Sequence, residues 1–400
     1  MNRSILLVIC VVACLPSTGG VAKAQDKPNV EIPKVEHRGG IYYLVLDGKT
    51  PFERGYQHGK ALKFPISMAL RNFKEWLRSQ ANIKDPTRMI KDYAESTQYI
   101  ATVKKEVPDL FEEMRGIADG SGADFNELFV YQSFDELFLF LQKSGSLDHA
   151  DGHCTTVGVY GRAGKPNMVT HNNDIPTYHE GVGTVLHIKY PDSDLEILQA
   201  TFAGQVGQNG VNNRGVAVGI NTIADLPTSN GGIPVSFNVR KILECKDRHE
   251  AVKYLKSKSF GTAMNYTIGD REKVICVETW KSNAVVLDHY PDKIVAHTNH
   301  TLQKNAPVTF KMDASSGGGS HGFTHQRLEL AMKTLSEDPD AITFDDVRKL
   351  KSTRPILVNP GKPSGRTLMS MIAVVPKEGA PVLFNTPDSP NWFDHVKFEF

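Results

Sequence analysis

The spacing of apolar residues changes partway along the chain. From Arg54 to about Gln142, apolar positions recur every three and four residues, as in GYQHGKALKFPISMALRNFKEWLRSQ, which predicts amphipathic helices. From residue 154 onward the pattern becomes short β-rich runs such as CTTVGVYG, NMVTHNN and TVLHIKY, separated by Gly, Asn, Asp and Pro, which predicts strands. The polar stretch SGSLDHADGH at 144–153 lies between them without periodicity and is expected to be an exposed connection.

Other segments complete this pattern. An alternating run at 39–48 predicts an early strand, helical stretches are expected at 235–245, 249–258, near 325–337 and at 344–351, and strand-like runs lie between and after them. Pro108 suits a helix start, and Gly120 and Gly122 suit a helix end. This succession predicts an α+β fold in which helices cover the outer faces of packed sheets.

The first residues carry the signature of an export signal. Arg3 precedes an apolar stretch from Ile5 to Leu15, and Ala22-Lys23-Ala24 gives the small-x-small pattern of a cleavage site. The stretch is too short for a stable membrane span. We therefore expect residues 1–24 to be a signal peptide and the protein to be exported, to the periplasm or outside the cell. The alternative is a lipid anchor at Cys14, because Val11-Val12-Ala13-Cys14 loosely resembles a lipoprotein box without its usual Leu.

Composition narrows the function classes. Lys and Arg total 46 and Asp and Glu total 45, a net charge of +1, so nothing favours a nucleic-acid partner. Hydrophobic residues make up 40% of the chain, enough to build a sizeable core.

Three cysteines remain once the signal is removed: Cys154, Cys245 and Cys276. An odd count in an exported protein leaves at least one thiol unpaired. A bridge between Cys245 and Cys276 with Cys154 free is the simplest arrangement, and three buried thiols are the alternative. No CxxC, HExxH or Cys/His cluster has zinc spacing, so we predict neither a metal nor a cofactor.

Cys154 has the chemistry of a nucleophile. A free thiol is only slightly ionised at neutral pH and needs a base. Cleavage of the peptide bond before Cys154 would free its α-amine, whose pKa of about 7.7–8.0 lies close to neutral pH. One residue would then supply both the nucleophile and the base. A structural cysteine at a strand start is the plainer interpretation.

Two polar segments can complete such a site. Asp174 in THNNDIP follows Cys154 by 174 − 154 = 20 residues, and a strand–turn–strand of that length brings its two ends together. Its carboxylate could orient the cysteine amine. Asn299 in AHTNH follows a predicted strand, and its amide can donate a hydrogen bond to a developing oxyanion. Taken alone, each fits an ordinary turn or cap equally well.

Motifs spread over most of the mature chain carry a resemblance. They are ERGYQHGKAL, FEEMRGIADGSGADFNEL, CTT at 154–156, NND at 172–174, GVNNRGVAVGIN, TNH at 298–300, HQRL at 325–328 and TLMSMIAVV. In this order and spacing the chain resembles the isopenicillin-N acyltransferase-like family of N-terminal-nucleophile (Ntn) cysteine hydrolases.

The resemblance implies a four-layer αββα sandwich with a helical N-terminal segment, made as a precursor that cuts itself between His153 and Cys154. Residues 25–153 and 154–400 would then form a small and a large chain, held together as a heterodimer. By position, Cys154 is the nucleophile, Asp174 the residue that positions the amine, and Asn299 the oxyanion donor. Arg366 resembles a substrate-side arginine, and the substrate would be a small-molecule or peptide-like acyl amide.

Two positions depart from the family pattern. His153 stands where family members usually have Gly, which puts self-cleavage in question because Gly permits the strained backbone that assists it. An imidazole beside the bond could instead carry protons. Asn173 replaces an aromatic residue and is expected to alter the substrate pocket.

Two other functions compete with an exported cysteine amidohydrolase or acyltransferase that works through an acyl-Cys154 thioester. One is a phospholipase-B-like lipid hydrolase of the same superfamily. The other is a non-enzymatic exported binding protein, which His153 favours and in which Cys154 is merely a buried strand residue. Loss of amide cleavage on substitution of Cys154 would exclude the binding protein. No CGxCW-type signature surrounds Cys154, which disfavours a papain-like protease.

Overall fold

A computed structural model describes residues 28–147, 153–309, 322–358 and 365–400. The signal-peptide prediction for residues 1–24, the lipid-anchor alternative at Cys14, and residues 148–152 of the predicted exposed connection lie outside this part of the chain. The division into chains 25–153 and 154–400 remains a prediction.

The described residues form two β-sheets. Nine strands make the larger sheet, in the order β1 (Glu36–Arg38), β2 (Ile41–Leu46), β5 (Gly183–Lys189), β6 (Glu196–Phe202), β7 (Asn209–Asn212), β8 (Ala217–Thr222), β9 (Met264–Gly269), β10 (Val274–Trp280) and β11 (Asn283–Val286). Six strands make the smaller sheet, in the order β12 (Ile294–His297), β3 (His153–Val159), β4 (Asn167–Ile175), β13 (Arg366–Val375), β14 (Val382–Asn385) and β15 (Val396–Phe398). Neighbouring strands are antiparallel except β2 and β5.

Helices fall into an N-terminal group and two later pairs. The N-terminal group comprises α1 (Pro51–Ala61), α2 (Lys63–Ser79), α3 (Pro86–Ser96), α4 (Tyr99–Glu106), α5 (Pro108–Ser121), α6 (Phe125–Gln132) and α7 (Phe134–Lys143). The later pairs are α8 (Val235–Leu243) with α9 (Arg248–Lys256), and α10 (Gly322–Ser336) with α11 (Phe344–Lys351); a short 3-10 turn, η1, covers Thr177–His179.

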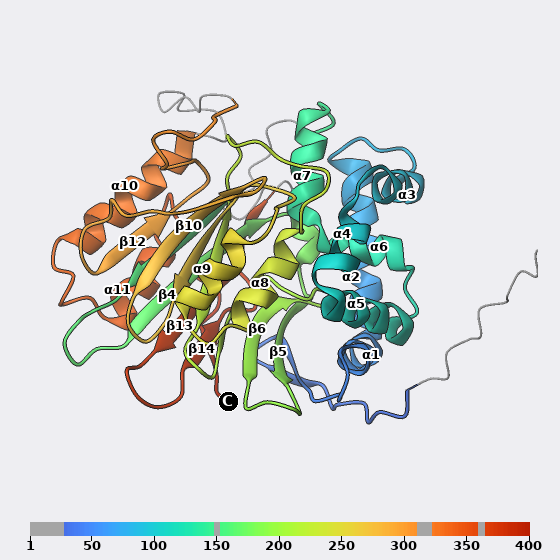
Figure 1. Ribbon diagram of the computed structural model, residues 1–400, viewed down its shortest axis with the longest axis horizontal. Helices are drawn as coiled ribbons and strands as arrows, with labels where there is room; N and C mark the ends of the chain where they lie inside the picture. The colour runs from blue at the N-terminus through green and yellow to red at the C-terminus, as the bar shows by residue number, and fades with distance from the viewer. Residues whose placement is uncertain (1–27, 148–152, 310–321, 359–364) are drawn as a thin grey trace, which may run out of the picture.

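The sheets and the later helices stack in four layers. Strands β3 and β4 of the smaller sheet pack on β8 and β9 of the larger one, α8 and α9 lie against the larger sheet, and α10 lies against β12 and β3. Helix α11 joins the same outer layer, because Val347 and Leu350 share an apolar cluster with Val157 and Ile372. Helices α1–α7 lie on the opposite side of the molecule from α10 and α11 (Figure 1). The predicted αββα sandwich with a helical N-terminal segment is confirmed.

The N-terminal segment is not a separate helical body. Strand β2 pairs in parallel with β5, so this segment also supplies the outer strands of the larger sheet. The helix start at Pro108 and the stop at Gly122 are confirmed, since α5 begins at Pro108 and Gly122 has a left-handed φ of 76°. Gly120 is not part of the stop, because it lies inside α5.

Glycine allows α1 and α5 to come close together. A Cβ placed at Gly55 would lie 1.9 Å from the carbonyl oxygen of Glu113, and one at Gly116 would lie 2.1 Å from that of Phe52. Gly59 and Gly120 make the same kind of approach to Ile117 and Tyr56. Backbone meets backbone at all four positions, so no side chain can move aside to make room.

Gly116→Ala should therefore destabilise the fold. Alanine favours a helix over glycine by up to about 1 kcal/mol, but overpacking against a rigid backbone costs about 1–3 kcal/mol or more. We expect a lower urea midpoint for Gly116→Ala. Gly183→Ala is the control, because its Cβ would have ordinary contacts at 3.5 Å. Equal stability of the two variants would contradict the packing argument.

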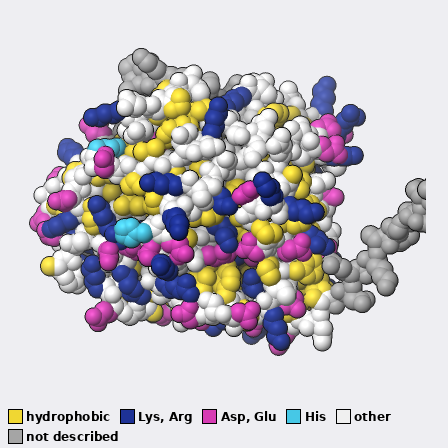
Figure 2. Space-filling view, in the orientation of Figure 1, with side chains coloured by type: hydrophobic (Ala, Val, Ile, Leu, Met, Phe, Trp, Pro, Cys, Tyr) yellow, Lys and Arg dark blue, Asp and Glu magenta, His cyan; other side chains and the backbone are white. Residues whose placement is uncertain are grey.

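Charge is evenly distributed on the visible surface. Basic and acidic side chains interleave there, and neither sign forms a continuous patch on this face (Figure 2). Within the described ranges, each helix is either too short or too polar to cross a membrane.

Candidate active site

Cys154 lies near the start of β3, with 9% of its surface exposed. The predicted hairpin is confirmed: β3 pairs antiparallel with β4, placing Cys154 opposite Asn173 and His153 opposite Asp174. Thus the strand that carries Cys154 and the strand that carries Asp174 are direct neighbours.

The backbone of Cys154 is held by side chains where β12 no longer pairs. Strand β12 pairs with β3 only from Thr156 onward. Beyond that point the Cys154 N–H donates to Asn299 Oδ1 at 3.0 Å, and Arg327 Nη1 donates to the Cys154 carbonyl at 2.6 Å. Arg327 Nη2 also donates to Asn299 Oδ1 at 2.8 Å. Asn299 and Arg327 therefore extend the strand ladder with side-chain groups.

The amide nitrogen of Asn299 is already occupied in this uncut chain. Asn299 Nδ2 donates to the Thr222 carbonyl at 3.0 Å. The residue meets the peptide bond at Cys154 as an acceptor, through Oδ1, rather than as the donor that an oxyanion needs. Its predicted oxyanion role would require Nδ2 to exchange partners and remains a prediction.

Strong contacts fix the loop that carries Asn299. The Asn299 N–H donates to Thr324 Oγ1 at 2.9 Å, which ties the loop to α10. Just before it, His297 Nε2 bonds Glu278 Oε1 at 2.9 Å, and both side chains are completely buried. This network positions Asn299 relative to β3.

A fully buried lysine bonds to strand β3, which carries Cys154. Lys351, the last residue of α11, donates from Nζ to the Thr155 carbonyl at 2.6 Å. Its own carbonyl accepts from Asn172 Nδ2 at 2.9 Å. Lys351 thus bonds to both strands of the hairpin.

Asp174 is buried, and in the described part of the chain only one of its two carboxyl oxygens has a hydrogen-bond partner. Thr367 Oγ1 donates to Asp174 Oδ1 at 2.5 Å. Among the described residues Asp174 Oδ2 has no hydrogen-bond partner. A buried carboxylate oxygen in this state can accept a further hydrogen bond, such as one from an amine.

Burial dominates the electrostatics of the site. It raises the pKa of Asp174 to about 7, with Arg327, Thr367 and Lys351 opposing the rise. It lowers the pKa of Lys351 to about 7, and it lowers that of Arg327. Burial also raises the pKa of the Cys154 thiol, helped by the charge of Asp174. In the uncut chain the thiol is therefore protonated at neutral pH.

A second carboxylate reaches the site from the N-terminal segment. Thr222 Oγ1 donates to Asp135 Oδ1 at 2.5 Å, while the carbonyl of the same threonine accepts from Asn299. Burial raises the pKa of Asp135 to about 6. Helix α7 is thereby linked through Thr222 to the residue that holds Cys154.

Arg366 lies beside the site but is already paired. It begins β13, next to Thr367, and its guanidinium bonds Glu180 at 2.6 Å and also pairs with Asp388. Its predicted substrate-binding role remains a prediction.

Asn173 is fully buried opposite Cys154, and Nδ2 has no partner in the described part of the chain. His153 contributes its backbone to β3 opposite Asp174.

The suggested bridge between Cys245 and Cys276 is wrong. Both thiols are free and buried, as is Cys154. Cys276 lies within strand β10 and contacts Thr267 Oγ1 at 3.4 Å, whereas Cys245 follows α8 and donates to the Lys241 carbonyl at 3.3 Å. The alternative of three buried thiols holds. No group of side chains in the described ranges could hold a metal ion.

Sequence reasoning missed Arg327, Lys351 and Asp135. Arg327 lies inside HQRL, a segment used only for the family resemblance. Lys351 follows Val347 by one helical turn, so the period of α11 places it on the buried face, yet a terminal lysine usually faces solvent. Nothing in the sequence around Asp135 distinguishes it from a charged helix position.

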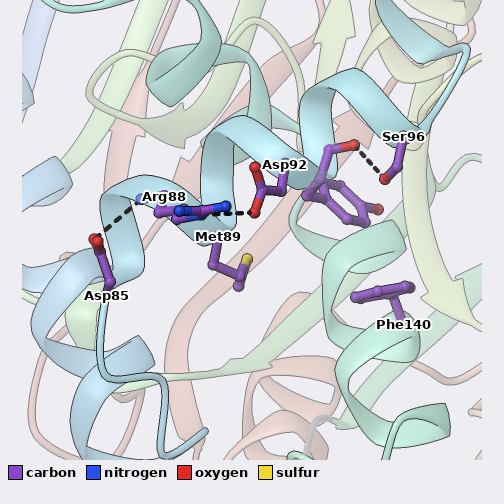
Figure 3. Close-up of a pocket in the computed structure, with 7 residues that line it drawn as sticks. Asp85, Arg88, Met89, Asp92, Ser96 and Phe140 are labelled. Carbon is purple, nitrogen blue, oxygen red and sulfur yellow. Dashed lines mark hydrogen bonds and ion pairs between the residues drawn. The ribbon is translucent and has the colours of Figure 1, made fainter.

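A separate pocket lies between α3 and α7. It encloses about 360 Å³ and is lined by residues that include Arg88, Asp92, Tyr93 and Phe140. Figure 3 shows Arg88 lying along α3 between Asp85 and Asp92, with the ring of Phe140 across the opening. Its lining contains none of the residues that contact Cys154.

The chain is similar in sequence to acyltransferases over a range that includes most of the residues in the site. A family model described as "AAT: Acyl-coenzyme A:6-aminopenicillanic acid acyl-transferase" matches residues 162–333, a span that includes Asp174, Asn299 and Arg327 and starts after Cys154. The "Acyl-coenzyme A:6-aminopenicillanic-acid-acyltransferase 40 kDa form" of Emericella nidulans is 26% identical over 356 residues, covering 86% of this chain and 92% of that protein. These two matches support the predicted resemblance to the isopenicillin-N acyltransferase-like family.

Solved structures give weaker likenesses. The N-acylethanolamine-hydrolyzing acid amidase (NAAA) ortholog of Caenorhabditis elegans is 16% identical with a TM-score of 0.41, covering 62% of this chain and 100% of that one. A variant of the conjugated bile acid hydrolase of Clostridium perfringens is 13% identical with a TM-score of 0.38, covering 62% and 97%. At scores below 0.5, the fold assignment rests on the layers and registers described above.

The raised pKa of Asp174 makes a stability prediction. Between its ordinary value of 3.8 and about 7, the folded chain keeps a proton that the unfolded chain has lost. The free energy of unfolding should therefore fall as pH rises through this window. Asp174→Asn should remove this fall and so gain stability relative to the parent toward pH 8. Urea melts in a Cys154→Ala background, with exposed Asp345→Asn as control, would test it. Parallel pH profiles for all three proteins would contradict the assignment.

Proposed function

We propose that this protein is a self-processing cysteine amidohydrolase or acyltransferase, activated by cleavage between His153 and Cys154. One observation carries the proposal: the N–H and C=O of Cys154 are both held by buried polar side chains, Asn299 and Arg327. Every buried backbone N–H and C=O needs a partner, but at Cys154 both partners are side chains and not a neighbouring strand. The Cys154 N–H belongs to the very bond that self-cleavage would break.

Self-cleavage would proceed by an acyl shift. The Cys154 sulfur attacks the carbonyl carbon of His153, the C–N bond breaks, and the nitrogen takes up the thiol proton to become the α-amine of Cys154. Water then hydrolyses the thioester, giving a carboxylate at His153 and a free thiol. Asn299 Oδ1, 3.0 Å from this nitrogen before the cut, is suited to hold the amine afterwards.

Turnover would reuse the same groups. The α-amine accepts the thiol proton, the sulfur attacks a linear amide, and the protonated amine returns that proton to the leaving nitrogen. Water or a second amine resolves the acyl-Cys154 thioester. Asp174 would stabilise the ammonium form, which its position opposite His153 and the unpaired Oδ2 in the described part of the chain support.

The sequence supports two further parts of the proposal. Residues 1–24 would direct export, and hydrolysis would then prevail over transfer because water is abundant outside the cell. The described residues favour neither the lipid-hydrolase nor the binding-protein alternative. The cleavage experiment below tests the binding-protein alternative.

Cleavage can be tested by intact mass and N-terminal sequencing of the purified protein beside Cys154→Ala. We expect two wild-type chains, one of which begins Cys-Thr-Thr, and a single uncut chain for the variant. The two chains should co-elute in gel filtration. A single uncut wild-type chain would mean that His153 prevents maturation, and the binding-protein hypothesis would then be preferred.

The role of Asn299 can be tested with two substitutions. Asn299→Ala should fold but lose about 10²–10³-fold in amide turnover, the usual cost of losing one such hydrogen-bond group. Asn299→Asp keeps the acceptor oxygen and removes the N–H donor. If Asn299→Asp retains amide turnover, Asn299 acts as an acceptor. If Asn299→Asp loses amide turnover, Asn299 acts as the oxyanion donor. Exposed Asn305→Ala is the control, and normal kinetics in Asn299→Ala would exclude both roles.

A further inference from the structure

Lys351 is an unusual residue to find sealed inside a fold. Its side chain is completely buried, and its Nζ reaches the Thr155 carbonyl at 2.6 Å. Charged lysine is almost never fully buried without a compensating partner. One carbonyl uses only one of the three donors of an ammonium group.

The same side of the hairpin holds unpaired acceptors. Asp174 Oδ2 and Asn172 Oδ1 are both buried without a partner in the described part of the chain. Both alternate with Asn173 along β4, and Asn172 pairs with Thr155, the residue whose carbonyl Lys351 bonds. Asp174, Asn172 and Thr155 thus share one face of the hairpin, the face that Lys351 approaches from α11.

The charges around this face are unbalanced. Arg327 and Lys351 bring two positive charges, against one carboxylate at Asp174. Groups that act electrostatically on Lys351 come from every neighbouring element: Asp174 and His171 on β4, Cys154 on β3, Arg327 on α10 and His395 before β15. Burial lowers the pKa of both histidines, to about 4 for His395, so both imidazoles are neutral at pH 7, and Asp174 is the one carboxyl group in this set.

We propose that Lys351 is a positioning residue that, together with Arg327, favours the ionised form of Asp174 inside the buried site, so that Asp174 can hold the ammonium form of the Cys154 amine. This inference rests on the proposed function. Burial favours the protonated form of the Asp174 carboxyl, and the positive charges of Arg327 and Lys351 oppose this effect. A neutral Asp174 would no longer stabilise the charged amine.

Two substitutions separate the charge of Lys351 from its hydrogen bond. Lys351→Met removes both and keeps a similar shape. Lys351→Gln keeps an N–H donor for the Thr155 carbonyl and removes the charge. Lys349→Met, on the exposed face of the same helix, removes an equal charge away from the site and should behave as the parent.

The main measurement is the pH profile of amide turnover by the processed enzyme. An opposite charge nearby lowers a carboxyl pKa by about 1–3 pH units. Both Lys351 variants should therefore shift the acid limb upward by at least about one pH unit. An acid limb that is unchanged in both variants would overturn the proposal. A limb that shifts in Lys351→Met alone would also overturn it, because only the hydrogen bond of Lys351 would then matter.

A second measurement does not depend on activity. In uncut Cys154→Ala protein, the fall in stability with rising pH should extend to higher pH when Lys351→Met or Lys351→Gln is added. Adding Asp174→Asn should abolish that difference. If wild type is neither cut nor active, the proposed function fails, but these melts still decide the link between Lys351 and Asp174. If both uncharged variants are unfolded at pH 5, where Asp174 is protonated, the link is overturned.

Discussion

Asn299 and Arg327 bind the backbone N–H and C=O of Cys154, and we call this pair of contacts the clamp. The rest of the site depends on it. A strand end normally leaves its N–H and C=O to water or to another strand. Here β12 stops pairing at Thr156, and Asn299 and Arg327 take over the two groups of Cys154. Because both are side chains, they can respond to a change at Cys154 without disturbing the sheet. A main-chain ladder would bond the same nitrogen but could not release it after a cut.

Removal from water strengthens the electrostatic interactions around Cys154. Arg327, Lys351 and Asp174 are completely buried, where charges interact far more strongly than in water. The same burial makes each charge costly, so the three groups must compensate one another. The carboxyl and the lysine both have pKa values displaced to about 7, which places their ionisation near neutral pH.

The N-terminal segment contributes to this arrangement in two ways. Strand β2 extends the larger sheet, and α1 is pressed onto α5 through glycines that allow backbone contact. Helix α7 then presents Asp135 to Thr222, whose carbonyl holds the amide of Asn299. A chain cut before Cys154 would therefore keep its two parts together, since the smaller one is built into both the sheet and the site.

The sequence by itself determined the local elements and part of the site. Period and turn residues place the helices, the strands and the β3–β4 hairpin, and the hairpin alone puts Asp174 beside Cys154. It could not decide which polar residues are buried. Arg327 and Lys351 resemble ordinary charged helix positions in the sequence, and Asn299 resembles a turn residue. The residues of β3 that they bond lie 145 residues from Asn299 and 172 or more residues from the two cations. Only the packing of α10 and α11 on the smaller sheet brings these groups to one strand. Burial at this strand is a property of the tertiary structure. It removes these charged side chains from water, so that they must compensate one another electrostatically.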